Sequence, residues 1–229
     1  MKVCKFGGSS LSTSKNMERA LAIVKADRDR QIIVVSAPGK VDSDDIKVTD
    51  LLINVANKYN CFEYDYIVSR GEYIMAKLFS KISGYNFVDA KDYIIINQNG
   101  KVNEMLTKQR LKKLPKPCVI GGFYGSDIYG NIRTFARGGS DYTGAVIAAL
   151  LNAEVYENYT DTNGVFTCDP NQDANCKHIE QIGYDQMYDM AKSGARVIYA
   201  ECLPLLKKYK VQLIVRNTFN PNGGYTVIK

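Results

Sequence analysis

The sequence predicts an α/β fold built around a mainly parallel β-sheet. Short β-rich runs alternate with amphipathic segments along the chain, which is typical of this class. The continuous run Gln31–Ser36 (Gln-Ile-Ile-Val-Val-Ser) has the composition of a parallel strand that is covered on both faces. The 229 residues contain no internal repeat and no obvious linker, so a single domain over residues 1–229 is expected.

The first 40 residues predict a β–loop–α–β unit with a right-handed crossover. Lys2–Phe6 is the first strand, and a glycine-rich turn follows it directly. A helix is then indicated by apolar residues at positions i, i+3, i+4 and i+7, namely Met17, Ala20, Leu21 and Val24. The strand Gln31–Ser36 ends at Pro38-Gly39.

The remaining elements follow from the same patterns. Leu51, Leu52 and Val55 mark one helix, and Ile74, Leu78 and Ile82, flanked by Met75 and Phe79, mark another. Residues 121–139 are glycine-rich and predict a loop and hairpin. The other expected strands are Tyr93–Ile96, Cys118–Ile120, Val155–Thr160, Val211–Asn217 and Tyr225–Ile228. The other expected helices are Ser140–Ala153, with Ser140 as N-cap, Tyr184–Lys192 and Glu201–Lys208.

Composition excludes several functions. The net charge of +6 is mild, and the densest basic stretch, Lys101–Lys116, has no interleaved aromatic residue, so we expect a solvated helix face and no nucleic-acid partner. No apolar run approaches the roughly 18–20 residues of a membrane span, and the charged N-terminus does not resemble a signal peptide. The six cysteines form no C-x-x-C pair, which predicts reduced thiols in a cytoplasmic protein without a zinc site. The one histidine, His178, is expected at the surface.

Two Gly-Gly-Ser turns carry the chemical signal, each preceding a predicted helix: Lys5-Phe6-Gly7-Gly8-Ser9-Ser10 and Arg137-Gly138-Gly139-Ser140-Asp141. Glycines let backbone N–H groups converge on an anion, and a helix N-terminus adds partial positive charge. Walker A, G-x-G-x-x-G and protein-kinase motifs are absent. Phosphoryl transfer to a carboxylate fits better than histidine-dependent catalysis, because an ionised carboxylate is already a nucleophile.

The chain resembles the aspartokinases in the order of its motifs. These are the two glycine turns above, Val35-Ser36-Ala37-Pro38-Gly39, Ser69-Arg70-Gly71-Glu72, Gly122-Phe123-Tyr124-Gly125, Tyr159-Thr160-Asp161-Thr162-Asn163-Gly164-Val165 and Val215-Arg216-Asn217-Thr218-Phe219-Asn220-Pro221. The resemblance spans essentially the whole chain. It implies the amino acid kinase fold, an open αβα sandwich, and ATP-dependent phosphorylation of the β-carboxylate of L-aspartate, the first step of lysine, threonine and methionine synthesis.

The resemblance also implies roles for individual residues. Lys5 would neutralise the transferring phosphoryl group, the amides of Gly7, Gly8 and Ser9 would hold phosphate oxygens, and Asp141 would orient Lys5. The substrate pocket would comprise Ser36, Thr49, Glu72, Arg137, Gly138, Gly139 and Ser140, with Glu72 on the α-ammonium and Arg137 on a carboxylate. Thr160, Asp161 and Phe166 would hold the adenosine, and Arg196 would face the phosphates. Mg²⁺ would ride on ATP, because the chain shows no carboxylate cage.

Two departures from the family pattern keep alternatives open. Asn171 follows Asp169-Pro170 where the family has arginine, and Arg196 replaces a lysine. The alternatives are a kinase for another small amino acid and a non-catalytic nucleotide- or amino-acid-binding relative, while a homo-oligomer or a separate regulatory chain also stays open. The catalytic signature fills the 229 residues, so we expect no ACT regulatory domain and no feedback inhibition by lysine or threonine.

Overall fold

A mostly parallel sheet forms the centre of the protein, in a computed structural model that describes residues 1–59, 61, 63–136, 138–168, 175–195 and 197–229. Its strand order in the described residues is β10-β12-β11-β7-β1-β2-β4-β3, and every neighbouring pair is parallel except β11 and β12. The strands are β1 (Lys2–Phe6), β2 (Arg30–Val35), β3 (Asn86–Val88), β4 (Cys118–Gly121), β7 (Val155–Thr160), β10 (Gln181–Ile182), β11 (Gln212–Asn217) and β12 (Thr226–Ile228). Two hairpin-like pairs lie outside it, β5 (Tyr124–Ser126) with β6 (Ile132–Thr134), and β8 (Val165–Phe166) with β9 (His178–Ile179).

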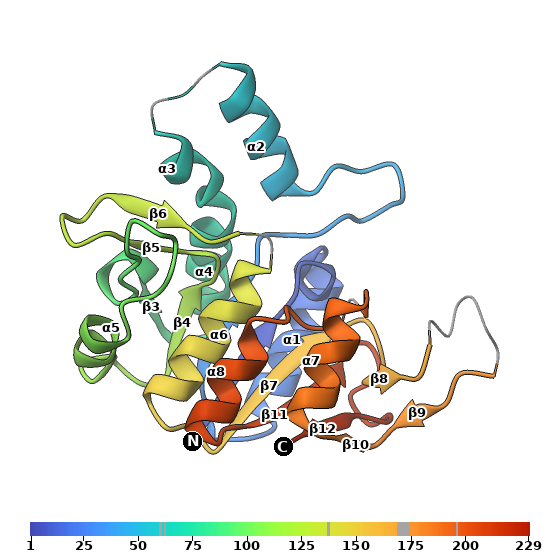
Figure 1. Cartoon of the computed structure of the whole chain (residues 1–229). Coiled ribbons are helices and arrows are strands. Elements are labelled where there is room, and N and C mark those ends of the chain that lie inside the picture. Colours follow the sequence, from blue (N-terminus) through green and yellow to red (C-terminus); the bar gives the residue numbers. More distant parts are fainter. Residues whose placement is uncertain (60, 62, 137, 169–174, 196) are drawn as a thin grey trace.

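Helices cover both faces of this sheet, which confirms the αβα sandwich (Figure 1). The helices of the described chain are η1 (Ser9–Leu11), α1 (Ser14–Lys25), α2 (Val48–Lys58), α3 (Tyr64–Val68), α4 (Arg70–Ser83), η2 (Ala90–Asp92), α5 (Glu104–Leu111), α6 (Gly139–Leu150), α7 (Tyr184–Lys192) and α8 (Cys202–Tyr209). Residues of β1 alternate between the two cores: Val3 packs with the core of α6 and α8, and Cys4 and Phe6 pack with that of α1 and α4.

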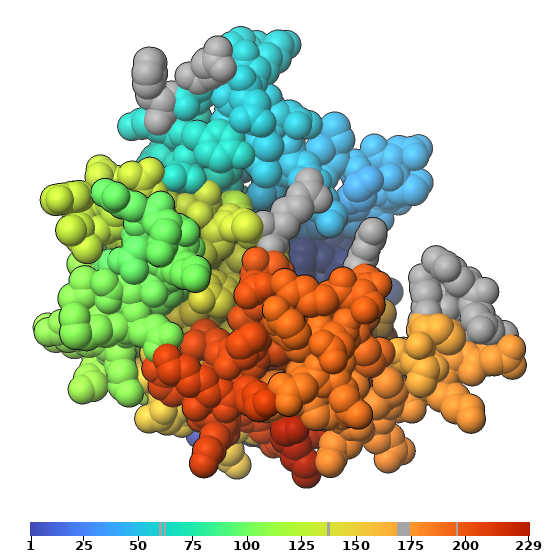
Figure 2. All heavy atoms as spheres, in the orientation of Figure 1, coloured from blue at the N-terminus to red at the C-terminus, as the bar shows by residue number. Residues whose placement is uncertain are grey.

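The carboxyl ends of the parallel strands meet at one edge of the sheet. In Figure 1 the helices α2 and α3 lie beyond this edge, and both termini lie at the opposite end. Figure 2 shows the same arrangement in space-filling form, with the light-blue and cyan segment standing above the body of the molecule. Ligands of open α/β sheets bind outside the carboxyl ends of the strands, so this edge is where the motif loops are brought together.

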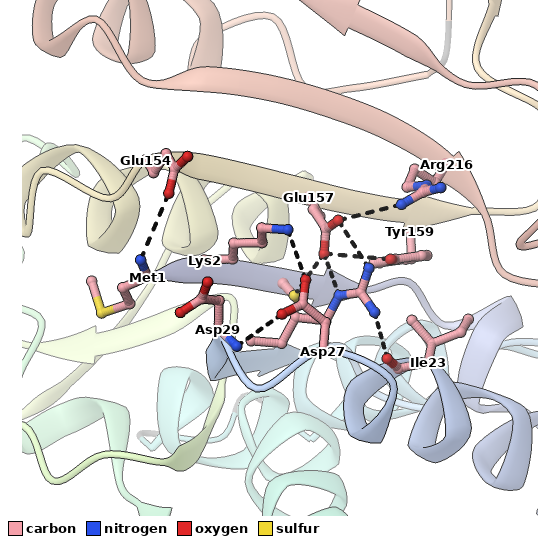
Figure 3. A network of polar contacts seen from close by, with 11 residues as sticks. Met1, Lys2, Ile23, Asp27, Asp29, Glu154, Glu157, Tyr159 and Arg216 are labelled. Atoms are coloured by element: carbon pink, nitrogen blue, oxygen red, sulfur yellow. Dashed lines mark hydrogen bonds and ion pairs between the residues drawn. The ribbon is translucent and has the colours of Figure 1, made fainter.

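A buried charge network ties four neighbouring strands together below this edge (Figure 3). Glu157 of β7 is 1% exposed and accepts hydrogen bonds from Arg30 Nε at 2.6 Å and from Arg30 Nη2 at 3.1 Å. Arg216 of β11 pairs with the same carboxylate at 3.5 Å, and Cys4 of β1 donates to it at 3.2 Å. Burial is the largest single influence on the pKa of Glu157 and raises it, but the hydrogen bonds and charge of Arg30, the hydrogen bond from Cys4 and the charge of Lys2 together lower the pKa of this carboxyl. The network fixes the lateral order of β2, β1, β7 and β11 beneath the loops.

Two expected elements differ from the structure. Tyr93–Ile96 is wrong as a sheet strand: the edge position belongs to β3, and this buried segment instead bonds the β5 hairpin, with Ile96 N donating to Ser126 O at 2.8 Å. Helix α6 begins at Gly139 with Gly138 as its N-cap, so Ser140 lies inside the first turn. Gly138 has φ +85°, a left-handed conformation that a serine would adopt only with strain.

Most of the apolar residues that mark α2 and α4 in the sequence do not lie on the buried faces of these helices. Met75 and Phe79 of α4 are buried, whereas Ile74, Leu78 and Ile82 are exposed. On α2, Leu51 and Val55 are exposed as well. The helices are therefore confirmed, but each carries apolar side chains toward solvent. No helix in the described part of the chain has the length and apolar character to cross a membrane.

The expectation of six reduced cysteines is wrong for one pair. Cys168 and Cys176 form a disulfide, because the β8–β9 pairing brings their Cα atoms to 5.3 Å. Cys4, Cys61, Cys118 and Cys202 are free. His178 is half-buried rather than at the surface, since its ring lies edge-on to Phe166 at a centroid distance of 5.3 Å.

Candidate functional site

Lys5 and Asp141 meet at the carboxyl end of β1. The Lys5 side chain is buried, and its Nζ lies 2.6 Å from Asp141 Oδ1. Asp141 stands in the first turn of α6, and its Oδ2 accepts a hydrogen bond from Tyr199 N at 3.2 Å. A Cβ on Gly7 would lie 3.4 Å from Lys5 Nζ, so the ammonium group lies close above the glycine turn. The ion pair therefore places the positive charge of Lys5 beside the backbone of the glycine turn, where Gly7 has no side chain to cover it.

The first glycine turn offers two free amides. Gly7 N donates to Tyr159 O at 3.2 Å, so this N–H already has an acceptor within the protein. The amides of Ser10 and Leu11 close the η1 turn onto Gly7 O and Gly8 O. Within the described residues, the N–H groups of Gly8 and Ser9 have no acceptor. These two amides are therefore the ones available to an anion, at a turn whose unpaired N–H groups favour negative charge.

The loop after β2 is pressed against this turn. Gly39 N donates to Gly8 O at 2.8 Å, and a Cβ on Gly39 would lie 2.7 Å from Gly8 C. At the start of the same loop, Ser36 N donates to Phe6 O at 3.1 Å. A glycine at position 39 is thus required by close backbone packing, and the hydrogen bond of Ser36 N holds this residue next to the end of β1.

Glu72 is a buried acid on the same side of the site. It lies in the first turn of α4, is 3% exposed, and burial raises its pKa to about 7. Thr49 Oγ1 donates to Glu72 Oε1 at 3.4 Å, whereas Oε2 is buried with no hydrogen-bond partner in the described chain. A Cβ on Gly71 would lie 2.7 Å from Ala37 Cβ, so α4 packs directly on the loop that contacts the glycine turn. An unpartnered buried carboxylate oxygen indicates a missing cationic or donor group.

The second glycine turn also packs tightly at this edge. A Cβ on Gly138 would lie 2.6 Å from the Tyr199 ring, and one on Gly122 would lie 2.7 Å from Ser140 Cα. Gly139 is buried, and a Cβ there would lie 2.7 Å from Phe135 Cβ. Ser140 and Asp141 are therefore held beside the end of β4. Arg137, Arg196 and Asn171 lie outside the described residues.

The residues expected to hold adenosine follow β7. Thr160 ends that strand, and its Oγ1 donates to the Oδ1 of the exposed Asp161 at 3.2 Å. Phe166 is half-buried in β8. Gly164, between them, has φ +93°, and a Cβ there would lie 2.5 Å from Thr226 Oγ1. Thr160 and Asp161 lie one strand away from the Lys5 turn, because β7 pairs directly with β1.

Sequence reasoning missed three residues of this site. Tyr199 holds Asp141 through its amide, and Tyr159 accepts from Gly7 through its carbonyl, so neither contact depends on a side chain that a motif reveals. Asn158 of β7 stands opposite Lys5 in the sheet register, is 1% exposed, and its Oδ1 has no partner in the described chain. The two adjacent polar residues Glu157 and Asn158 inside an expected sheet strand were the available signal for Asn158.

Among the residues that the structure describes, no group of three or more His, Cys, Asp or Glu side chains is arranged to hold a metal ion. The donors gathered here are instead a lysine and two free amides, and the nearby Asp141 carboxylate accepts from Lys5 and Tyr199. This set suits an anion that brings its own counterion, such as a polyphosphate with a bound cation.

An open αβα sandwich with glycine turns beside a held lysine is an arrangement suited to binding a phosphate group. The chain belongs to the amino acid kinase family, whose model matches residues 1–217. It is 32% identical to an aspartokinase of Rickettsia felis over 98% of this chain and 59% of that protein. The chain therefore spans somewhat more than half the length of that curated relative.

Solved structures agree with this assignment. The aspartate kinase of Clostridium acetobutylicum superposes with a TM-score of 0.91 at 31% identity, covering 100% of this chain and 63% of that one. E. coli aspartokinase III in complex with aspartate and ADP superposes with a TM-score of 0.85 at 24% identity, covering 100% of this chain and 64% of that one. The second likeness supports the fold alone.

Proposed function

We propose that this protein phosphorylates the β-carboxylate of L-aspartate with ATP, giving 4-phospho-L-aspartate and ADP. The observation that carries the proposal is Glu72, whose buried Oε2 lacks a partner in the described chain. An α-ammonium group supplies the missing charge, and an amino acid provides both that group and a carboxylate acceptor. A nucleoside monophosphate has no ammonium group to offer. The similarity to aspartokinases selects aspartate among the amino acids.

The proposed reaction needs no general base. An oxygen of the β-carboxylate attacks the γ-phosphorus, a new P–O bond forms, and the bond to the β,γ-bridging oxygen breaks as ADP leaves. Lys5 Nζ, held by Asp141, neutralises charge that spreads over the γ-phosphoryl oxygens. The amides of Gly8 and Ser9 bind phosphate oxygens. Mg²⁺ enters as part of the ATP complex and supplies charge neutralisation when bound.

The other expected residues complete the proposed site. Ser36, Thr49 and the turn Gly138-Gly139-Ser140 line the aspartate pocket, where Arg137 binds a substrate carboxylate through its fork of N–H donors. Thr160, Asp161 and Phe166 bind adenosine, and Arg196 faces the phosphates. ATP as donor also makes the cytoplasm the proposed location. The pathway step is the entry to lysine, threonine and methionine synthesis.

A hydroxamate assay tests the proposal directly. Pure protein with Mg-ATP, L-aspartate and hydroxylamine should yield aspartyl hydroxamate, because hydroxylamine traps the acyl phosphate. A parallel panel of glutamate, asparagine and D-aspartate defines the acceptor. Absence of hydroxamate from L-aspartate, with ADP binding intact, would refute the proposed function and leave a nucleotide-binding relative.

A further inference from the structure

The segment after β11 lies between the two loops that the proposed function assigns to ATP. Asn217 ends β11 and stands opposite Thr160 of β7 in the parallel register. Asn217 is 9% exposed and Thr218 is fully buried. Neither residue has a part in the site as described so far, although both fall in the closing motif of the sequence.

Asn217 holds the nucleotide loop (residues 160–164) through its side-chain amide. Its Nδ2 donates to Asp161 O at 3.2 Å and to Asn163 Oδ1 at 2.8 Å. Its Oδ1 accepts from Phe219 N at 2.7 Å, which fixes the orientation of the amide. One buried side chain therefore bonds two positions of the loop that carries Asp161.

Thr218 joins the nucleotide loop to the phosphate loop (residues 7–11). Its N donates to Thr160 O at 2.9 Å, and its Oγ1 shares a hydrogen bond of 2.7 Å with the Oγ of Ser10, which is also fully buried. In the sheet, β7 separates β11 from β1. The hydroxyl pair therefore crosses the end of β7 and connects the segment that follows β11 with the segment that follows β1.

We propose that Asn217 and Thr218 are positioning residues that hold the phosphate loop and the nucleotide loop at a fixed separation for ATP. The inference rests on the proposed function, which makes these loops the two ends of the ATP site. A ligand that spans two loops binds more tightly when the loops are already held in place, since less ordering accompanies binding. None of the hydrogen bonds given for Asn217 and Thr218 involves Glu72 or Thr49, so we expect the main effect on the nucleotide.

This selectivity separates positioning from simple packing. A buried hydroxyl pair that served packing alone would change the thermal stability without distinguishing the two substrates. A clamp between the ATP loops changes nucleotide affinity and leaves aspartate affinity in place. A serine at position 218 keeps the hydroxyl and should restore the wild-type behaviour.

The test compares Thr218→Val, Thr218→Ser and Asn217→Asp with the matched control Thr107→Val. Asn217→Asp retains the acceptor for Phe219 N. It replaces the donor Nδ2 by a carboxylate oxygen, which faces the acceptors Asp161 O and Asn163 Oδ1. Thr107 is a fully buried threonine of α5 whose Oγ1 accepts from Ile95 N at 3.0 Å, away from the loops. The readouts are the ADP dissociation constant by calorimetry, the KM values for ATP and aspartate, and the Tm.

Thr218→Val and Asn217→Asp should weaken ADP binding and raise the KM for ATP by about fivefold or more, as expected for a lost buried hydrogen bond. The KM for aspartate should stay within about twofold, Thr218→Ser should resemble the wild type, and Thr107→Val should lower Tm without changing ADP affinity. Unchanged ADP affinity in both variants, or equal rises in the two KM values, would overturn the clamp. A wild-type protein that binds ADP but makes no hydroxamate refutes only the proposed function, because calorimetry still tests the clamp. A wild type that binds no ADP overturns both.

Discussion

Lys5 Nζ lies 2.6 Å from Asp141 Oδ1, and both side chains are largely removed from solvent, with exposed fractions of 11% and 14%. The two residues come from different layers, Lys5 from the sheet and Asp141 from the first turn of α6. Tyr199 N holds the second carboxylate oxygen, so Asp141 has one oxygen for the backbone and one for the lysine. This arrangement fixes the direction of a flexible lysine side chain before any substrate arrives.

Removal of the Lys5 charge should abolish most turnover while the protein stays folded. Lys5→Met keeps the length of the side chain and should lower kcat by about 100-fold or more, the loss typical for one group that stabilises transition-state charge. Asp141→Asn should lower kcat by about tenfold or more, because Lys5 loses its orienting partner. Steady-state hydroxamate rates at saturating substrates measure both effects.

Lys2→Met is the matched control for this prediction. Lys2 belongs to the same strand and pairs with Asp27 at 2.7 Å, but at the opposite end of β1. The kcat of Lys2→Met should stay within about twofold of wild type, since this partly buried ion pair lies away from Lys5 Nζ and Asp141. Equal losses in Lys2→Met and Lys5→Met would show that charge on β1 matters only for folding.

The affinity for aspartate should fall as the pH drops below about 7. Burial raises the pKa of Glu72 to about 7, and an ammonium group pairs only with the ionised form. Each pH unit below this pKa should raise the KM for aspartate by about tenfold, until the pKa of the bound state is reached. In Glu72→Gln, the KM for aspartate should be high and should not change with pH between about 6 and 8.

The same group makes a signed contribution to stability. The folded-state pKa of Glu72 lies above the unfolded value of 4.5, so folding favours the protonated carboxyl. The free energy of unfolding should therefore decrease as the pH rises from about 4.5 to about 7, by on the order of 3 kcal/mol from this group. Urea unfolding of the wild type and of Glu72→Gln at several pH values across this window isolates the contribution of Glu72. The same pH dependence of the free energy of unfolding in both proteins would contradict it.

Gly39→Ala should displace the phosphate loop through a direct collision with its backbone. The new Cβ would lie 2.7 Å from both Gly8 C and Ser9 N, which are backbone atoms that cannot rotate away. We expect a loss of about 1–3 kcal/mol in the free energy of unfolding and a weaker affinity for ADP. Gly183→Ala is the control, because the nearest atom to its Cβ would be Gln186 Oε1 at 3.9 Å. ADP affinity equal to wild type in Gly39→Ala would argue against a phosphate loop at Gly8.

Much of this architecture follows from the sequence because periodicity reports local burial. The strands Lys2–Phe6 and Val155–Thr160 are confirmed at their expected bounds, as is the helix Tyr184–Lys192. The segment Tyr93–Ile96 has the same apolar signal but pairs with a hairpin, which depends on where other strands lie. Periodicity alone does not choose between a sheet edge and a buried loop.

The sequence predicts the site residues whose side chains carry the chemistry. It does not predict the contacts that are made by backbone groups. Lys5 and Asp141 stand out as charged residues beside the glycine turns, and Glu72 is an acid in the first turn of α4. The occupied amide of Gly7 and the amide of Tyr199 have no signature in side-chain pattern. The hydroxyl pair of Ser10 and Thr218 joins residues distant in sequence, so only the folded chain reveals it.

Asn158→Leu should make the protein more stable and less active. Asn158 is buried in the central strand β7 with an Oδ1 that has no partner in the described chain, and such an atom costs about 1–3 kcal/mol. Leucine has nearly the same shape and removes the unmet polar group, so urea unfolding should show a gain of about that size. Because Asn158 stands opposite Lys5, we expect the amide to support the charged site, and kcat should fall. A loss of stability would contradict the burial argument, and a gain without any fall in kcat would show that the amide has no part in the reaction.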